Sequence, residues 1–255
     1  MKESGFSNKL FFLLPAYNEQ ASISDLIDRI SEVCEDNSFN YNILVVDDGS
    51  VDKTAEIAKQ KSHDVPILVL QNRPNRGLGY TISRGLKFLS DRSESDDLII
   101  TLDADLTQDP VYVTKMLSKI YSGADVVIAS RYRKGSGTEG LSLFRHCLSI
   151  GASIFMMALH PINGVRDYSC GFRMYKANII KKGFSIYQDS FVTETGFACM
   201  VEIAARLRPY ARFTEIPFVL KYSYKRKPSE MKIATTIRAY LRVILHVKAF
   251  KLKNS

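Results

Sequence analysis

The sequence contains no apolar run long enough to cross a membrane. Its best candidate, residues 147–159, is broken only by serines and a glycine, but it is shorter than the roughly 20 residues that a membrane-spanning helix needs. The first nine residues are too polar to contain the apolar core of a signal peptide. The sequence alone therefore predicts a soluble or membrane-peripheral protein.

Residues that commonly bind transition metals or form disulfides are scarce. The four cysteines are widely spread without a Cys-x-x-Cys pair, which argues against a zinc site and a disulfide framework and fits a reducing cytosol. The four histidines are not at ligand spacing, and no Gly-x-Ser-x-Gly motif provides a serine nucleophile. Carboxylates and arginines remain as the candidates for chemistry.

The composition is that of a globular protein with an excess of positive charge. Hydrophobic residues make up 45% of the 255 residues and the formal net charge is +8. This charge suits nucleic acid, anionic lipid or phosphorylated substrates. No nucleic-acid motif occurs, and the basic residues are not expected to interleave with exposed aromatic ones, so we expect no nucleic-acid partner.

The first half of the chain alternates short apolar runs with segments of helical periodicity. Buried strands are predicted at residues 10–14, 43–46, 67–70, 98–102 and 126–129. Helices are predicted around residues 23–30, 55–58, 77–89 and 111–120. This alternation predicts an α/β fold with a mostly parallel central sheet and helices on both faces.

The second half is less regular and offers no linker that would mark a second domain. A helix is predicted over residues 191–207 and a strand over 213–220. Apolar spacing after residue 233, with basic residues on the other face, predicts an amphipathic helix. We therefore expect a tail over residues 1–9, one catalytic domain over 10–225 and a basic C-terminal helix over 226–255.

Polar residues directly follow three of the predicted strands. They are residues 15–19 (Pro-Ala-Tyr-Asn-Glu), 47–50 (Asp-Asp-Gly-Ser) and 103–105 (Asp-Ala-Asp). Because ligands bind outside the carboxyl ends of the strands in such sheets, we expect the three clusters to converge on one site.

Each cluster has two interpretations. Asp103 and Asp105 could share one hard cation with a substrate diphosphate, or they could form a solvated turn before a helix that Asp109 caps. Residues 47–50 could be a turn that caps the next helix, or they could hydrogen-bond a ribose or base. Tyr17 could stack on a nucleobase, or residues 15–19 could be only a helix entrance.

Taken together and in this order, the motifs resemble the family 2 glycosyltransferases. Within that family the chain looks most like the polyprenyl-phosphate (dolichyl-phosphate) mannosyl- and glucosyltransferases, over roughly residues 8 to 232. The match also includes residues 75–79 (Asn-Arg-Gly-Leu-Gly), 106–110, 130–132 (Ser-Arg-Tyr), Arg145, 167–173 (Asp-Tyr-Ser-Cys-Gly-Phe-Arg), Glu202 and 216–218 (Ile-Pro-Phe).

The resemblance implies a GT-A fold and inverting transfer of a hexose, mannose or glucose, from a GDP- or UDP-linked donor to a polyprenyl phosphate. It implies Mg²⁺ or Mn²⁺ at Asp103 and Asp105, and catalytic roles for Asp105, Arg131 and Arg145. The implied substrate-binding residues are Pro15, Ala16, Tyr17, Glu19, Asp47, Asp48, Gly49, Arg76, Asp103, Ala104, Arg131 and Arg145.

Arg131 and Arg145 match arginines that bind the acceptor phosphate in the family, which suits the shape of the guanidinium group. A phosphate acceptor is already anionic, so alignment and electrostatic stabilisation would be sufficient without a general base.

The sequence departs from the family pattern at two places. Some relatives place a glutamine metal ligand where this chain has Thr107, with Gln108 next to it, so the third ligand stays open. Relatives often read Ser-Lys-Met where residues 229–231 read Ser-Glu-Met. Lys225 or Lys232 could replace that basic contact to phosphate.

Membrane attachment and the acceptor each have alternatives. Residues 141–162 and the C-terminal helix could form an interfacial anchor at the cytoplasmic face of a membrane, or could complete the core, and a small membrane subunit is possible. A hydroxyl acceptor would instead require a general base, with Asp189, Glu194 and Glu202 as the nearest acids. A non-catalytic binding module is the third hypothesis, against which the intact acid pair and arginines argue.

Overall fold

The computed structural model describes residues 8–140, 150–151, 153–158, 161–226, 239 and 242–243. Most of the expected tail (1–9) and C-terminal helix (226–255) lies outside these residues, as do Arg145 and residues 229–232. Within the described ranges, no helix has both the length and the apolar composition needed to cross a bilayer.

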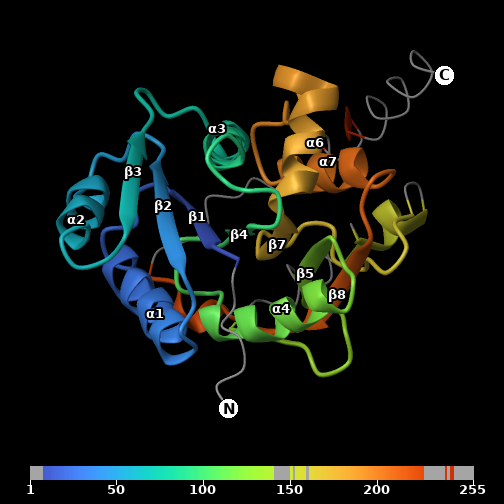
Figure 1. The fold of residues 1–255 in the computed structure, drawn as a ribbon, viewed down its shortest axis with the longest axis horizontal. Coiled ribbons are helices and arrows are strands. Elements are labelled where there is room, and N and C mark those ends of the chain that lie inside the picture. The colour runs from blue at the N-terminus through green and yellow to red at the C-terminus, as the bar shows by residue number, and fades with distance from the viewer. Residues whose placement is uncertain are drawn as a thin grey trace.

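A seven-stranded sheet forms the centre of the molecule (Figure 1), in the order β3-β2-β1-β4-β7-β5-β8. Neighbouring strands are parallel except around β7, which is antiparallel to both β4 and β5. The strands are β1 (Leu10–Ala16), β2 (Tyr41–Asp47), β3 (Ile67–Gln71), β4 (Leu98–Thr101), β5 (Val126–Ser130), β7 (Arg173–Lys176) and β8 (Phe213–Pro217). A separate parallel pair joins β6 (Gly137–Glu139) to β9 (Val219–Lys221).

Helices cover both faces of the sheet (Figure 1). On one face, α1 contacts the short turn η1 that leads into α4, and α2 packs against α1 and β3. On the other face, α3 packs against β1, α6 and α7. The helical segments are α1 (Ile23–Asp36), α2 (Thr54–Lys61), α3 (Leu78–Ser90), η1 (Pro110–Tyr112), α4 (Val113–Tyr121), α6 (Ala177–Tyr187), η2 (Gln188–Ser190), α7 (Ala198–Leu207) and η3 (Tyr222–Tyr224).

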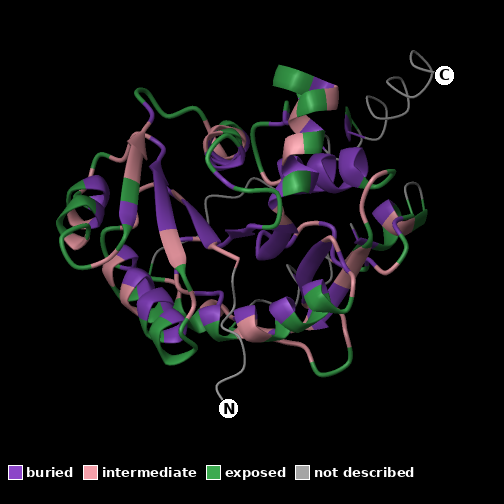
Figure 2. Cartoon of the chain, viewed as in Figure 1, coloured by how far each residue is buried: buried purple, intermediate pink, exposed green. Residues whose placement is uncertain are grey.

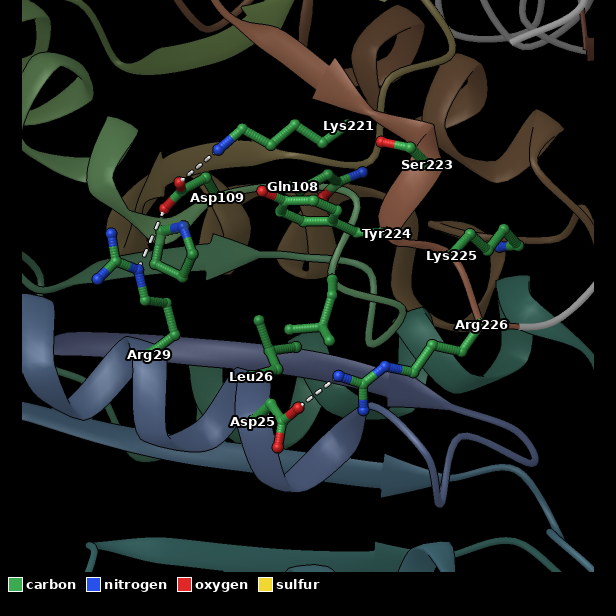
Figure 3. Close-up of a pocket in the computed structure, with 12 residues that line it drawn as sticks. Asp25, Leu26, Arg29, Gln108, Asp109, Lys221, Ser223, Tyr224, Lys225 and Arg226 are labelled. Carbon is green, nitrogen blue, oxygen red and sulfur yellow. Dashed lines mark hydrogen bonds and ion pairs between the residues drawn. The ribbon is translucent and has the colours of Figure 1, made fainter. Parts of the chain in front are cut away.

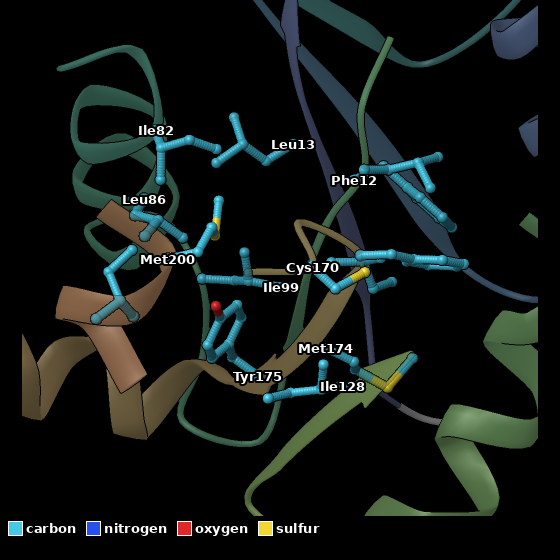
Figure 4. Packing of buried hydrophobic residues seen from close by; sticks show 14 of the residues in the cluster. Phe12, Leu13, Ile82, Leu86, Ile99, Ile128, Cys170, Met174, Tyr175 and Met200 are labelled. Carbon is cyan, nitrogen blue, oxygen red and sulfur yellow. The ribbon is translucent and has the colours of Figure 1, made fainter. Parts of the chain in front are cut away.

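The core lies between the sheet and these helices, as the burial pattern shows (Figure 2). β4 and β5 are buried along their whole length because both of their faces are covered, which explains their continuous apolar sequence. On one face, Leu13 and Ile99 meet Ile82 and Leu86 of α3 and Met200 of α7 (Figure 4). Packing of this kind fixes the strand ends from which the polar loops emerge.

The predicted α/β architecture is confirmed, with strands at all five predicted apolar runs. Two predictions in the second half were wrong in detail. The helix predicted over 191–207 begins only at Ala198, because the carboxylate of Glu202 binds the backbone N–H groups of Thr193 and Glu194 at 2.7 and 2.9 Å and holds them outside the helix. The strand predicted over 213–220 divides at Phe218 into β8 and β9, which join different sheets.

The beginning of α3 packs directly on the loop before α7. The N–H of Gly79 donates to the carbonyl oxygen of Thr195 at 2.8 Å, and a Cβ atom at Gly79 would lie 1.6 Å from the carbonyl oxygen of Glu194. Only glycine allows the two backbones to approach this closely. The glycine-containing segment 75–79 is therefore held against the segment 193–196.

Candidate active site

The first two polar clusters are joined by hydrogen bonds between the loops after β1 and β2. The side chain of Asn18 accepts from the N–H of Val51 at 2.9 Å, and the N–H of Asn18 donates to the hydroxyl of Ser50 at 2.9 Å. The N–H of Glu19 donates to the hydroxyl of Thr54 at 2.7 Å. The predicted convergence of the segments 15–19 and 47–50 is therefore present.

Asp48 directs its carboxylate to protein groups. One oxygen accepts from the side chain of Asn72 at 2.7 Å and from the N–H of Arg76 at 2.9 Å, and the other accepts from the N–H of Gly77 at 2.8 Å. Asp48 is buried. It fixes the loop before α3, and its predicted contact with a nucleoside stays a prediction.

The other predicted donor-binding residues lie around this junction. Pro15 and Ala16 end β1, Asp47 ends β2, and Gly49 turns the chain with a φ of 75°. Asp47 is buried and accepts from the N–H of Ser50 at 3.3 Å. The guanidinium of Arg76 lies over the ring of Tyr80 at 4.5 Å from its centroid.

Asp103 and Asp105 follow β4 and are held by Thr107 and Gln108 of the same loop. Asp103 accepts from the Gln108 side-chain amide at 2.7 Å, while the N–H of Asp103 donates to the amide oxygen of Gln108 at 3.0 Å. Asp105 accepts from the hydroxyl of Thr107 at 2.6 Å. Thr107 and Gln108, the two residues between which the third metal ligand was left open, thus both contact the acid pair. Ala104 between the acids is buried.

A second negative charge is unfavourable in the acid pair. Burial and the neighbouring Asp105 raise the pKa of Asp103 to about 7, and the positive charges of Lys225 and Arg131 only partly oppose this. Glu19 also raises the pKa of Asp103. The electrostatic contacts of one carboxylate therefore link residues from four separate segments of the chain.

Lys225 is the cation next to this pair, and its ammonium group forms an ion pair with Asp105. Burial alone would lower the pKa of Lys225, but the carboxylate of Asp105 raises it overall, so that the lysine stays charged. From the sequence, Lys225 was predicted only as an alternative, with Lys232, to a missing basic contact with phosphate. In the structure it occupies the position of a positive charge beside the acid pair.

A pocket of about 540 Å³ is lined by residues of the segment 221–226, Lys225 among them, together with residues of α1 and of the loop after β4 (Figure 3). Arg226 bridges its rim to Asp25 of α1 at 2.7 Å, and Lys221 pairs with Asp109 at 3.4 Å. Leu26 and Leu106 contribute apolar lining. The segment 221–226 is thus tied to α1 and to the loop after β4, and this holds Lys225 at the acid pair.

Arg131 directly follows β5 and is held by a buried carboxylate. Its Nε and Nη2 atoms donate to the two oxygens of Asp167, each at 2.7 Å, and Nη2 also donates to the hydroxyl of Ser169 at 2.8 Å. Burial alone would lower the pKa of Arg131, but Asp167 raises it well above its usual value. Arg131 is therefore a permanently charged and oriented guanidinium.

The loop that holds Arg131 also approaches the acid pair. A Cβ atom at Gly171 would lie 2.9 Å from Oδ1 of Asp103, so this loop passes directly over that carboxylate. The hydroxyl of Thr101 fixes the approach by donating to the carbonyl oxygen of Gly171 at 2.6 Å. The predicted donor side and the Arg131 side of the site are therefore neighbours.

The candidate general bases differ in their surroundings. Glu202 accepts from the N–H and hydroxyl of Thr193, the N–H of Glu194 and the guanidinium of Arg206, so both of its oxygens are used within the protein. Asp189 is exposed on η2. Glu194 is buried and lies 3.6 Å from Arg242.

Sequence reasoning missed the groups that hold these side chains in place. Asp167 appeared only as part of a matching motif, and Glu215, which binds the backbone of Asp167, was not noticed. Glu215 is an acid between Phe213 and Ile216 of a predicted strand, a signal that could have identified it as buried and paired. Arg145 lies outside the described residues.

The donor set at the acid pair fits a hard divalent cation. Among the described residues, no group of three or more histidine, cysteine or acidic side chains is arranged around one point. Mg²⁺ and Mn²⁺ do not need such a group, because one or two carboxylates together with substrate phosphates and water are sufficient. Asp103 and Asp105 supply two carboxylates, and the raised pKa of Asp103 marks the charge that a cation would neutralise.

Lys225→Met is expected to tighten binding of Mn²⁺ in the absence of nucleotide by about five-fold. The substitution removes a cation that competes for Asp105. A five-fold change in affinity corresponds to about 1 kcal/mol of such competition. Titration of Mn²⁺ by electron paramagnetic resonance measures the change. Lys87→Met, which removes a distant exposed lysine, serves as the control. Unchanged or weaker Mn²⁺ binding in Lys225→Met would show that the lysine does not compete with the metal.

The chain belongs to glycosyl transferase family 2, whose family model matches residues 12–184. It is 31% identical over 237 residues to a dolichol-phosphate mannosyltransferase of Pyrococcus furiosus, covering 92% of this chain and 62% of the relative. It is 35% identical to an undecaprenyl-phosphate 4-deoxy-4-formamido-L-arabinose transferase of Salmonella choleraesuis, covering 82% of this chain and 58% of the relative. The chain thus spans about three fifths of the length of these curated relatives.

Solved structures show the same fold. A glucosyl-3-phosphoglycerate synthase of Mycobacterium tuberculosis, crystallised with Mn²⁺, uridine diphosphate and glucosyl-3-phosphoglycerate, aligns with a TM-score of 0.64 at 18% identity, covering 94% of this chain and 80% of that one. A further mycobacterial protein aligns with a TM-score of 0.65 over 94% of this chain and 75% of its own. The predicted GT-A fold is confirmed.

Proposed function

We propose that this protein transfers a hexose, mannose or glucose, from a nucleotide-diphosphate sugar to a polyprenyl phosphate, with inversion at the sugar carbon. One observation carries the proposal: an acid pair suited to a metal diphosphate lies beside an arginine suited to a second phosphate. The relatives named for dolichol phosphate and undecaprenyl phosphate support the choice of acceptor.

The donor side would be formed by the loops after β1, β2 and β4. Asp103 and Asp105 would hold Mg²⁺ or Mn²⁺, which would supply positive charge to the diphosphate as it leaves. Lys225 is already next to Asp105 and would add a second cation there. Tyr17, Glu19 and the neighbouring loop residues would hold the nucleoside, and either a GDP- or a UDP-linked donor is compatible with this proposal.

The acceptor side would be formed by Arg131 and, from the family resemblance, Arg145. A phosphate oxygen is anionic at neutral pH and can attack the sugar carbon without giving up a proton. The protein's contribution is then to align the two substrates and stabilise the charges. Of the three acids that could act as the general base for a hydroxyl acceptor, Glu202 is removed by its closed environment, because both of its oxygens already accept hydrogen bonds within the protein.

A lipid acceptor requires contact with a membrane surface. Ile154 and Phe155 expose 56% and 39% of their surface within the segment 141–162 that the sequence singled out as a possible anchor. The net charge of +8 would favour anionic headgroups. The buried, unpaired thiols of Cys34, Cys170 and Cys199 fit a reducing compartment, so we place the enzyme at the cytoplasmic face of the membrane.

An organic-phase extraction assay tests the proposal. Purified protein is incubated with polyprenyl phosphate, Mn²⁺ and a panel of labelled GDP- and UDP-sugars, and label is measured in the organic phase. We expect transfer from one donor, and its loss on chelation of the metal. Metal-dependent donor hydrolysis without transfer to lipid would contradict the lipid acceptor and favour a hydroxyl acceptor. Absence of donor binding would contradict the transferase function itself.

A further inference from the structure

The guanidinium of Arg131 is bound through Nε and Nη2, the latter also to the hydroxyl of Ser169, and its open edge consists of Nη1. Nε and Nη2 form the bound edge, which makes the two-point contact with Asp167. Among the described residues, Nη1 has no hydrogen-bond acceptor, and the side chain of Arg131 keeps 14% of its surface exposed. A guanidinium is planar and rigid, so clamping one edge determines the direction in which the other edge donates.

Asp167 is itself held by four donors. Besides the two side-chain bonds, it accepts from the backbone N–H of Arg131 at 3.0 Å and from the N–H of Cys170 at 3.1 Å. Its side chain has no exposed surface. Burial alone would raise the pKa of Asp167, but Arg131 lowers it overall, so that the carboxylate stays ionised. The Arg131–Asp167 pair is therefore a fixed, fully charged contact.

Behind Asp167 lies a second buried acid, Glu215 of β8. One of its oxygens accepts from the N–H groups of Arg166 and Asp167, each at 2.7 Å. The other oxygen accepts from Nε of Arg133 at 2.6 Å. Glu215 thus fixes the backbone that carries the side chain of Asp167. The same carboxylate binds Arg133, two residues after Arg131.

We propose that Glu215 and Asp167 are positioning residues that together aim the open edge of Arg131 at the acceptor phosphate. Glu215 fixes the backbone of the loop, Asp167 fixes the guanidinium, and Arg131 contacts the ligand. Neither acid touches a substrate. This inference rests on the proposed function, because it gives the open edge of Arg131 a phosphate to bind.

The geometry also explains why two acids are buried here. A charged guanidinium can lie at many angles on a flexible chain, and each misaligned angle loses a directional hydrogen bond to phosphate. An ion pair at a protein surface would be too weak to select one angle. A buried carboxylate with several donors is held firmly, because losing any partner would leave a buried charge uncompensated.

Glu215→Gln is the central test, because glutamine keeps the shape of the side chain but not its charge. We expect the KM for polyprenyl phosphate to rise about ten-fold, with the KM for the nucleotide sugar within two-fold of wild type. Asp125→Asn is the matched control. Asp125 lies just before β5, at the end of that strand opposite to Arg131. There it pairs with Lys176 at 3.0 Å and accepts from the N–H of Arg212 at 2.9 Å. Asp125→Asn is expected to leave both KM values unchanged.

A double variant separates positioning from a general loss of stability. If Glu215 acts through Arg131, then adding Glu215→Gln to Arg131→Lys should change the acceptor KM by less than two-fold. A further ten-fold rise in the double variant would overturn the proposal, and so would an equal rise of donor and acceptor KM in Glu215→Gln alone.

A second readout does not depend on activity. The Nε–H of Arg131 donates to buried Asp167, so this hydrogen should exchange slowly with water in the wild-type protein. Its nitrogen-coupled NMR signal should be absent from Arg131→Lys. We expect Glu215→Gln to speed this exchange at least ten-fold while Asp125→Asn does not. Unchanged exchange would refute the positioning role. Faster exchange in a protein that fails to glycosylate polyprenyl phosphate would support the positioning role and refute only the proposed acceptor.

Discussion

Asp105→Asn is expected to reduce metal-dependent sugar transfer by about 10³-fold while the protein stays folded. A metal that neutralises a leaving diphosphate stabilises the transition state by several kcal/mol, and about 4 kcal/mol corresponds to three orders of magnitude in rate. Asparagine keeps an oxygen that can accept from the Thr107 hydroxyl, which donates to Asp105 at 2.6 Å in the wild-type protein. What is lost is the negative charge that would share the metal with Asp103.

The same substitution tests the role of Lys225. In the wild-type protein its ammonium group pairs with Asp105, and in Asp105→Asn that pair is absent. Two cations, the metal and the lysine, would therefore lose the same partner. We expect weaker Mn²⁺ binding as well as slower transfer, whereas loss of a merely structural carboxylate would change neither once the protein has folded.

The measurement combines the extraction assay with Mn²⁺ titration and thermal unfolding. Asp91→Asn removes an exposed carboxylate from an ion pair with Lys87 and serves as the control for a change in charge. Near-normal transfer by Asp105→Asn at saturating Mn²⁺ would show that the acid pair is not the metal site. A large drop in the melting temperature would prompt the same assay on Asp103→Asn before any conclusion is drawn.

Local pattern was sufficient to predict the first half of the fold. β4 and β5 are covered on both faces, so their sequences are continuous apolar runs, and α1 buries Ile23, Leu26, Ile27 and Ile30 at helical spacing. The carboxyl ends of parallel strands necessarily share an edge of the sheet, which is why the convergence of residues 15–19, 47–50 and 103–105 could be inferred.

The fold of the second half of the chain depends on contacts between residues that no local sequence pattern reveals. β7 is a four-residue strand inserted antiparallel between β4 and β5, and it has too few residues to show a period. The helix α7 begins late because of Glu202, a residue four positions inside it that binds the preceding backbone. Only the folded chain brings such partners together.

The sequence was sufficient to predict which residues belong to the site, but not which groups each of them contacts. Asp48 and Arg131 were both identified, yet Asp48 uses its carboxylate on the loop of residues 72–77, and Arg131 uses half of its guanidinium on Asp167. The partners of Arg131 lie 36 and 38 residues along the chain. Which edge of a polar group remains available to a ligand is decided by these distant contacts.

Arg131 is expected to matter for the acceptor far more than for the donor. A hydrogen bond to a charged group contributes about 1.5–3 kcal/mol, so that Arg131→Ala should raise the KM for polyprenyl phosphate by about 10- to 100-fold. The KM for the nucleotide sugar should change much less. Steady-state kinetics with each substrate varied in turn measure the two effects separately.

Arg131→Ala also leaves Asp167 buried without its cation, which can cost about 3–5 kcal/mol of stability. Arg131→Lys is therefore the better-controlled variant, because it keeps the positive charge and removes only the two-edged guanidinium. If a point charge near the acceptor were sufficient, Arg131→Lys would retain the wild-type KM for polyprenyl phosphate. If the open edge of an oriented guanidinium is required, Arg131→Lys will share the acceptor defect of Arg131→Ala while unfolding at a higher temperature. Equal losses for donor and acceptor in both variants would remove Arg131 from the acceptor site.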